Sequence, residues 1–261
     1  MWTRLRPWVF PLLLLAALEL YVRSVAGSSD ALATPTQALK AWWQLLWLTS
    51  DEGLWRVTGF TLGTAALGLL LGAFLGLLLG LILGLSRRAG HMSFLTVEVL
   101  RPIPSVALIP LAMLVFGFGI RMELSVVAFA TFWPMLILTQ AAARQVEPRL
   151  LEVSAALGLS AWQRTKWIVF PAMIPRLFVA LRLGVAVALV VAVTVEIAAN
   201  PHGMGYAMMI AQQSMEPDRM LAWLFWIGVV GMLINVLTLR AQHWVHVRMG
   251  GTVLQTSQAS T

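Results

Sequence analysis

The stretch from Glu152 to Pro171, EVSAALGLSAWQRTKWIVFP, is the longest polar interruption in the apolar second half of this chain. Pro148, just before it, suits the first turn of a helix, where its missing N–H costs nothing. Gly158 is able to end that helix by entering a left-handed conformation. Ser160, with Gln163 three residues later, forms a capping box for a second helix. The pattern predicts two short helices around a break.

Two prolines, Pro171 and Pro175, follow the second short helix. Because proline lacks an N–H and crowds the preceding turn, we expect them to stop that helix before the next apolar segment. The two helices would then form a rigid, angled element at a membrane surface, carrying Glu152, Arg164 and Lys166.

The composition defines the class of protein. The chain has 261 residues, of which 59% are hydrophobic and 11% charged, and its mean hydropathy is +0.83. A soluble domain of this length has too little interior for so much apolar surface, so we predict an all-α integral membrane protein with about six transmembrane helices. The net charge of +7 does not indicate nucleic-acid binding, because the basic residues gather at the ends of apolar runs. The lack of cysteine excludes disulfides and thiolate chemistry.

The N-terminal segment, residues 1–26, has two interpretations. Arg4 and Arg6 precede an apolar run, which fits either a secretory signal peptide or a first membrane helix anchored by its arginines. We favour the helix. Residues 27–55 form an outer connection containing one amphipathic piece, residues 36–48, that suits the membrane interface. Its apolar stripe consists of Leu39, Trp42, Trp43, Leu46 and Trp47.

The second predicted span, residues 57–85, carries a glycine at every fourth position. Apolar helices in lipid associate through close backbone contact, and a stripe of small residues permits that approach. We therefore expect the stripe to be the packing groove for another helix. Its members are Gly68, Gly72, Gly76, Gly80 and Gly84.

The third predicted span, residues 94–118, contains an arginine and three prolines. Prolines at membrane depth bend a helix and are tolerated where protein or a wet cavity covers the freed carbonyls. Glu98 lies three residues before Arg101, so an ion pair on one helix face is expected. Two readings stay open, a kinked structural helix and a lining of a transport pathway. The residues concerned are Glu98, Arg101, Pro102, Pro104 and Pro110.

Three further spans are predicted over residues 124–143, 174–197 and 220–239, and a disordered tail over 250–261. Arg121 and Glu123 are expected in a short outer turn before the fourth span. Arg182 and Glu196 both belong to the fifth span but lie about 21 Å apart along a helix. Each must therefore find another partner, for which a second copy of the chain is one candidate.

The basic residues predict the orientation of the six spans, with both termini in the cytoplasm. Eleven lie on the predicted cytoplasmic side (Arg4, Arg6, Arg87, Arg88, Arg144, Arg149, Arg164, Lys166, Arg176, Arg240 and Arg248) and five outside (Arg23, Lys40, Arg56, Arg121 and Arg219). This asymmetry follows the positive-inside rule and places residues 152–171 in the cytoplasm.

The stretch at 152–171 resembles the EAA loop, the cytoplasmic coupling loop of ABC importer permeases. Glu152, Gly158, Ile168 and Pro171 stand at the spacing of that pattern. Val153 and Ser154 replace its two alanines, and Phe170 replaces its leucine. These replacements are small or apolar, so the packing of the loop is expected to survive.

Two other segments resemble the permeases of nitrate, taurine, alkanesulfonate and thiamine-precursor importers. The first is Arg-Pro-Ile-Pro at 101–104, followed by Pro-Leu at 110–111 and Phe-Gly-Phe-Gly at 116–119. The second is Gly-Met-Gly-Tyr at 203–206, which is similar to an outer loop of that family. The resemblance covers about residues 36–245.

The resemblance implies a type I ABC importer permease fold in the inner membrane, with residues 56–249 as the permease core and 147–171 as the coupling loop. Two copies would form the solute pathway, separate ATPase subunits would hold ATP and Mg, and an external solute-binding protein would deliver the cargo. The residues implied in coupling to the ATPase are Glu152, Ser154, Ala155, Gly158, Arg164, Ile168 and Pro171. The residues expected along the pathway are Glu98, Arg101, Pro102, Pro104, Pro110, Arg182 and Glu196.

The chemistry that the chain lacks supports a non-enzymatic role. No glycine-rich loop ending in Lys-Ser or Lys-Thr is present, so the chain itself is not expected to bind ATP. No arrangement of nucleophile, base and acid stands out, and no metal or other cofactor is expected on this chain. A stand-alone secondary transporter is the alternative, although no inverted repeat or midplane acidic site is evident. Arg101 and Arg182, the two arginines within predicted spans, favour a small oxyanion or organosulfonate as cargo.

Overall fold

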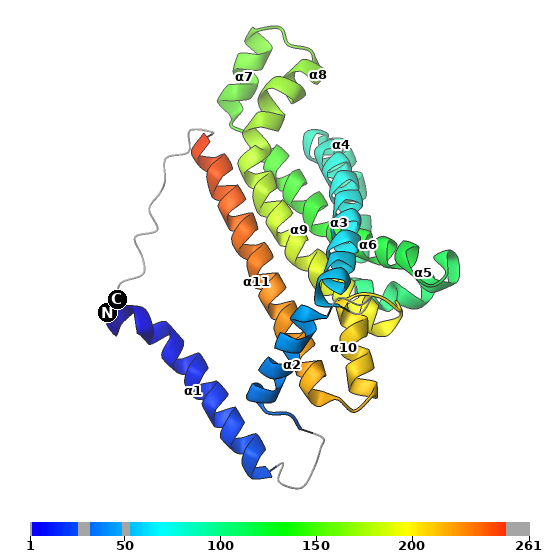
Figure 1. Cartoon of the computed structure of the whole chain (residues 1–261). Coiled ribbons are helices and arrows are strands. Elements are labelled where there is room, and N and C mark those ends of the chain that lie inside the picture. The colour runs from blue at the N-terminus through cyan, green and yellow to red at the C-terminus, as the bar shows by residue number, and fades with distance from the viewer. Residues whose placement is uncertain (1, 26–31, 49–52, 249–261) are drawn as a thin grey trace.

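The structure is a computed structural model that describes residues 2–25, 32–48 and 53–248, and it contains no strand within them (Figure 1). The predicted tail, residues 250–261, lies outside these ranges. In chain order the elements are α1 (Trp2–Val25), α2 (Pro35–Trp47), α3 (Leu54–Leu85), α4 (Arg87–Leu100), the 3-10 turn η2 (Ser105–Leu108), α5 (Ile109–Phe116), α6 (Ile120–Arg144), α7 (Pro148–Ala156), α8 (Ala161–Arg164), the π-helical turn η3 (Thr165–Val169), α9 (Phe170–Ala198), α10 (Met204–Gln213) and α11 (Pro217–Arg248).

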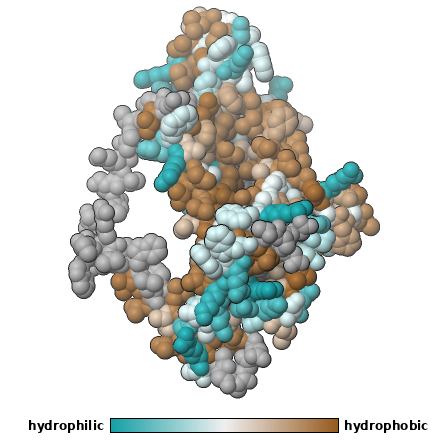
Figure 2. All heavy atoms as spheres, in the orientation of Figure 1, coloured by the Kyte–Doolittle hydropathy of each residue, from teal (hydrophilic) through white to brown (hydrophobic). Residues whose placement is uncertain are grey.

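Four helices among the described residues are long and apolar enough to cross a membrane. These are α3, α6, α11 and the continuous helix from Ala161 to Ala198 that joins α8 to α9. A fifth span results if α4 and the segment η2–α5 are taken together, although they meet at a bend of 81°. Figure 2 shows hydrophobic residues across the middle of the visible face, with hydrophilic residues gathered towards its two ends. Helix α1 forms as expected, and its crossing of the membrane stays a prediction.

The glycine stripe of α3 packs against α6, as predicted. A Cβ added at Gly72 would overlap the side chain of Thr131 and the backbone carbonyl of Ala128. A Cβ added at Gly76 would lie 2.7 Å from the carbonyl oxygen of Phe132. Gly68, Gly80 and Gly84 meet α6 in the same way. The two backbones therefore approach as closely as glycine alone permits, and this pair forms the centre of the bundle.

Helices α9 and α11 complete the bundle. The face of α9 that carries Ala188, Val191, Ala192 and Val195 joins the core that α3 and α6 form. A second core links α2, α9, α10 and α11 around buried tryptophans, of which Trp226 donates from Nε1 to the hydroxyl of Thr58 at 2.7 Å. Helix α11 is thereby attached to both α2 and α3.

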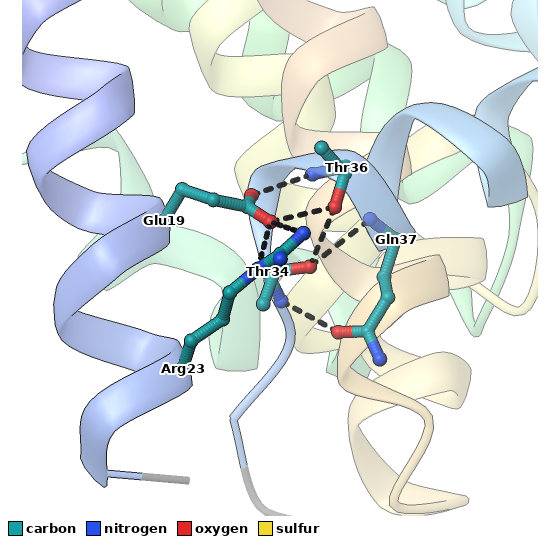
Figure 3. A network of polar contacts seen from close by, with 5 residues as sticks. All are labelled: Glu19, Arg23, Thr34, Thr36 and Gln37. Carbon is teal, nitrogen blue, oxygen red and sulfur yellow. Dashed lines mark hydrogen bonds and ion pairs between the residues drawn. The ribbon is translucent and has the colours of Figure 1, made fainter.

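Helix α1 is held to the rest of the molecule by a polar network (Figure 3). The carboxylate of Glu19 accepts hydrogen bonds from the backbone N–H of Thr36 at 3.1 Å and from its hydroxyl at 2.8 Å. Arg23, one turn further along α1, forms an ion pair with the same carboxylate at 2.7 Å. Thr34 and Gln37 form a capping box at the start of α2. A carboxylate thus faces the N-terminus of α2, where the helix dipole favours it.

The face of α2 that packs against the bundle is not the apolar stripe that was predicted to suit the membrane interface. Ala38, Ala41 and Leu45 are buried, whereas Trp43 and Trp47 are 58% and 71% exposed. The predicted stripe is split because Trp42 and Leu46 turn towards α11 and the other large side chains turn outward. The bundle side of α2 therefore combines Ala38 and Ala41 with larger side chains, those of Trp42, Leu45 and Leu46.

Candidate coupling loop and outer polar site

The coupling loop has the helix–break–helix structure that the sequence predicts. Pro148 occupies the first turn of α7, and Gly158 follows the end of that helix with φ of 65°. The N–H of Leu159 donates to the carbonyl of Ser154 at 3.1 Å, and that of Gly158 donates to Ala155 at 3.0 Å. This pair of hydrogen bonds is a Schellman ending, which needs a left-handed residue at Gly158. The angle between α7 and α8 is therefore set by local hydrogen bonds.

The capping box at the start of α8 is also confirmed. The backbone N–H of Ser160 donates to Oε1 of Gln163 at 2.9 Å, and the N–H of Gln163 donates to the Ser160 hydroxyl at 3.3 Å. Both bonds satisfy donors that the first turn of a helix would leave unpaired.

The prediction that Pro171 and Pro175 end the second helix is wrong. Both lie inside α9, and the helix runs without a stop from Ala161 to Ala198. The π-helical turn η3 explains this, since the N–H of Phe170 donates five residues back to the carbonyl of Thr165. The wider turn takes up one extra residue just before Pro171, which relieves the crowding that a proline ring causes in an α-helix. The coupling loop is thus continuous with a membrane span.

The predicted coupling residues divide into an exposed set and a packed set. Glu152, Ala155, Gly158 and Arg164 are exposed on the loop that projects from the end of the bundle in Figure 1. Ser154 is buried and its hydroxyl donates to the carbonyl of Leu151 at 2.6 Å. Ile168 and Pro171 are half-buried next to Val169, which packs into a core with the end of α6.

The third predicted span is broken and not merely kinked. Pro102 and Pro104 lie between α4 and η2, where the chain turns by 81°, and Pro110 lies in the first turn of α5. The predicted ion pair is present, with 3.8 Å between Arg101 Nη1 and Glu98 Oε1. Both side chains are about half exposed, at 53% and 49%. Because Pro102 and Pro104 remove two backbone N–H donors within three residues, one continuous helix is not maintained here.

Arg182 finds its partner within the same chain. Its guanidinium donates from Nη2 to Oδ1 of Asn235 on α11 at 3.3 Å. Asn235 is neutral, so the positive charge of Arg182 is not cancelled by this contact. No hydrogen bond or ion pair between described residues joins Arg182 to Arg101 or to Glu196.

Glu196 is fully buried at the opposite end of α9 from the coupling loop. Its Oε2 accepts a hydrogen bond from the backbone N–H of Gly205 at 2.9 Å, in the first turn of α10. The neighbouring N–H of Met204 donates to the hydroxyl of Thr61 on α3 at 2.9 Å. The carboxylate therefore binds the N-terminus of α10. Glu196 finds its partner within the same chain and does not need one from a second copy.

The structure adds Glu123 to this site, although the sequence analysis placed it in a short outer turn with Arg121. Glu123 lies in the first turn of α6 and is fully buried. Its Oε1 accepts from the hydroxyl of Thr64 at 2.5 Å, and its Oε2 accepts from the side-chain amide of Asn200. Following the orientation predicted from the basic residues, we call Thr61, Thr64, Glu123, Glu196 and Asn200 the outer polar site. The regular threonines of α3, at 58, 61 and 64, were the available signal, because they mark a polar face on an apolar helix.

Gly203 closes the outer polar site. Its φ is 94°, and a Cβ added there would overlap the carboxylate of Glu196. Both the backbone conformation and the close approach require glycine. The segment from Asn200 to Gly205 is thereby attached to α3, α6 and α9 at once.

We expect Gly203→Ala to destabilise the protein more than Gly119→Ala. Both glycines have a positive φ, but nothing lies within 4 Å of a Cβ added at Gly119. The backbone strain of a side chain at positive φ costs about 1–3 kcal/mol in both variants. Only in Gly203→Ala does the overlap of the new Cβ with Glu196 cost about 1–3 kcal/mol more. Thermal unfolding of the two variants in the same detergent measures the difference. Equal midpoints would contradict the close contact with Glu196.

Residues 68–251 match the family described as binding-protein-dependent transport system inner membrane component. The chain belongs to this family. The permease named for aliphatic sulfonates transport, SsuC of Bacillus subtilis (strain 168), is 30% identical over 232 residues, which are 87% of this chain and 83% of that protein. The riboflavin transport system permease protein RibX of Chloroflexus aurantiacus is 34% identical, over 79% of this chain and 77% of its own.

A solved structure supports the same fold. A chain of the MetNI methionine ABC transporter, in an inward-facing conformation, superposes with a TM-score of 0.66 at 18% identity. The match covers 76% of this chain and 99% of that one. The chain is therefore an ABC importer permease of the nitrate, taurine and sulfonate family, with a type I importer fold. Its relatives are transport proteins and not enzymes. The alternative function, a stand-alone secondary transporter, is not favoured by these matches.

Proposed function

We propose that two copies of this chain form the membrane pathway of an importer, driven by separate ATPase subunits that dock on the coupling loop. The continuous helix from Ala161 to Ala198 is the observation that carries this proposal. At 1.5 Å per residue it spans about 57 Å, and it joins the exposed coupling loop directly to Glu196 in the outer polar site. A displacement of α8 therefore moves the whole of α9.

The mechanism follows from the contacts at the two ends of this helix. At one end, Arg176 donates to the carbonyl of Gln145 at 3.1 Å, so α9 is attached to the last residues before the coupling loop. At the other end, Glu196 carries the start of α10 through its bond to Gly205. ATP-driven closure of the ATPase pair would push α7 and α8, and α9 would transmit that movement to the segment 200–205. In this proposal the coupling loop and both termini face the cytoplasm, the outer polar site faces a solute-binding protein, and ATP and Mg stay on the ATPase.

A small oxyanion or organosulfonate is the proposed cargo. Arg182 keeps an uncancelled charge beside Asn235, and Arg101 is half exposed at the broken third span. Guanidinium groups bind planar or tetrahedral oxyanions through paired donors. One relative is named for aliphatic sulfonates, which fits this chemistry, and another is named for riboflavin, so the solute-binding protein is expected to set the final choice.

A tagged pull-down of the full chain from its native membrane in mild detergent tests the proposal. We expect a soluble nucleotide-binding subunit to be recovered with the wild-type chain. The amount recovered is expected to fall at least tenfold with Glu152→Lys, because that change reverses the charge of an exposed loop residue. Arg88→Gln, outside the coupling loop, serves as the matched control. Recovery of the chain alone, together with solute transport that needs no ATPase, would refute the proposal.

A further inference from the structure

A cavity of about 500 Å³ lies where the coupling loop meets the ends of the membrane spans. Leu85 at the end of α3, Leu151 on α7 and Val169 in η3 form its apolar walls. Its polar lining is basic: Arg87 and His91 from α4, Arg144 from α6 and Arg164 from α8. None of the residues that line it is an aspartate or glutamate.

The three arginines of this cavity are not neutralised by the part of the chain that the structure describes. No side-chain hydrogen bond or ion pair with another described residue involves Arg87, Arg144 or Arg164. All three arginines are exposed, so water screens part of the repulsion among them and leaves their guanidiniums accessible to an anion. The described residues therefore place no counter-charge on these guanidiniums.

Arg144 is held in place against α4. A Cβ added at Gly90 would overlap its Nη2 atom, so the guanidinium lies directly on the backbone of the first turns of α4. Arg144 also ends α6, where a cation complements the helix dipole. That dipole is equivalent to about half a charge, which leaves most of the charge of the three guanidiniums uncompensated.

We propose that this cavity binds a tetrahedral oxyanion of the phosphate class, held between Arg87, Arg144 and Arg164. Three guanidiniums from three helices supply paired N–H donors in different directions, which suits a tetrahedral anion better than a planar one. The inference rests on the proposed function for its cytoplasmic position. There the phosphate of an anionic lipid and inorganic phosphate are both at hand.

Such an anion would connect the coupling loop to the bundle. Arg164 belongs to α8, whereas Arg87 and Arg144 belong to the ends of α4 and α6. A bound phosphate group would join these elements and stiffen the start of the helix that runs to Glu196. The site therefore links the anion content of the inner leaflet or cytosol to the efficiency of coupling.

Binding to the purified full chain tests this proposal. Thermal unfolding is followed while inorganic phosphate is added, and again in lipid nanodiscs of phosphatidylcholine with or without phosphatidylglycerol. We expect the unfolding temperature to rise with anion concentration and then level off. In Arg87→Gln the concentration that gives half of this rise is expected to be about tenfold higher or more, because charged hydrogen bonds are lost. Arg88→Gln is the matched control, because Arg88 is adjacent in sequence but does not line the cavity.

The results separate the two sources. Stabilisation by phosphate identifies a soluble anion, and stabilisation by phosphatidylglycerol alone identifies a lipid headgroup, provided that Arg87→Gln weakens it and Arg88→Gln does not. No stabilisation by either, or equal effects of the two variants, would overturn the site. The assay needs no ATPase, so its result is independent of the pull-down. Anion binding by a chain that is recovered alone and transports solute without an ATPase would refute the proposed function and keep the site.

Discussion

Replacing Gly158 by proline is expected to abolish ATP-driven uptake while leaving the chain inserted in the membrane. Gly158 has φ of 65°, and proline holds φ near −65°, so the Schellman ending of α7 would not form. The N–H that Gly158 donates to Ala155 would also disappear. Helix α7 would then leave its position relative to α8, and the coupling loop would no longer fit a partner. Uptake in reconstituted vesicles, compared with the amount of inserted chain, measures the effect.

Gly158→Asn is the control for this prediction. Nothing lies within 4 Å of a Cβ added at Gly158, so a side chain there is excluded by backbone conformation alone and not by space. Asparagine tolerates the left-handed region better than other residues with a side chain, so we expect Gly158→Asn to retain most of the uptake. Normal uptake by Gly158→Pro, or equal loss in both variants, would refute the role of this turn.

Replacing Gly72 by leucine is expected to prevent correct packing of the bundle. The overlap with Thr131 and Ala128 leaves no room for any side chain, because one of the two obstacles is backbone. Overpacking of this kind costs about 3 kcal/mol or more, which is a large part of the stability of a domain. We therefore expect an aggregated or rapidly degraded chain.

Gly63→Leu tests whether the position or the leucine is responsible. Gly63 belongs to the same helix, but nothing lies within 4 Å of a Cβ added there. We expect this variant to behave like the wild-type chain in size-exclusion chromatography and thermal unfolding of detergent extracts. A folded Gly72→Leu variant, or an equally damaged Gly63→Leu variant, would contradict the close packing of α3 on α6.

The correct sequence predictions concern features that depend on neighbouring residues. The ending at Gly158 and the capping box at Ser160 and Gln163 are made by hydrogen bonds between residues three to five positions apart. The glycine stripe of α3 follows from the helical repeat, which places every fourth residue on one face. The wrong prediction at Pro171 is also instructive, because a π-helical turn is a local alternative that the proline pattern does not reveal.

The outer polar site was only partly predictable. Glu196 was recognised because a carboxylate in an apolar span is unusual. Glu123 was missed because it stands beside Arg121 at the end of a span, where an exposed turn is the ordinary expectation. Its partners, Thr64 and Asn200, lie 59 and 77 residues away in the chain, so nothing near Glu123 in the sequence indicates its burial.

The sequence by itself determined the membrane class, the main helices, their caps and the family, because hydropathy, helical periodicity and turn chemistry act over a few residues. Only the tertiary structure decided which charges are buried and what they contact. It brought Arg182 to Asn235, Glu123 to Asn200, and three arginines to one cavity below the coupling loop. Such contacts depend on how distant helices pack, and packing is set by the shapes of all the faces that meet.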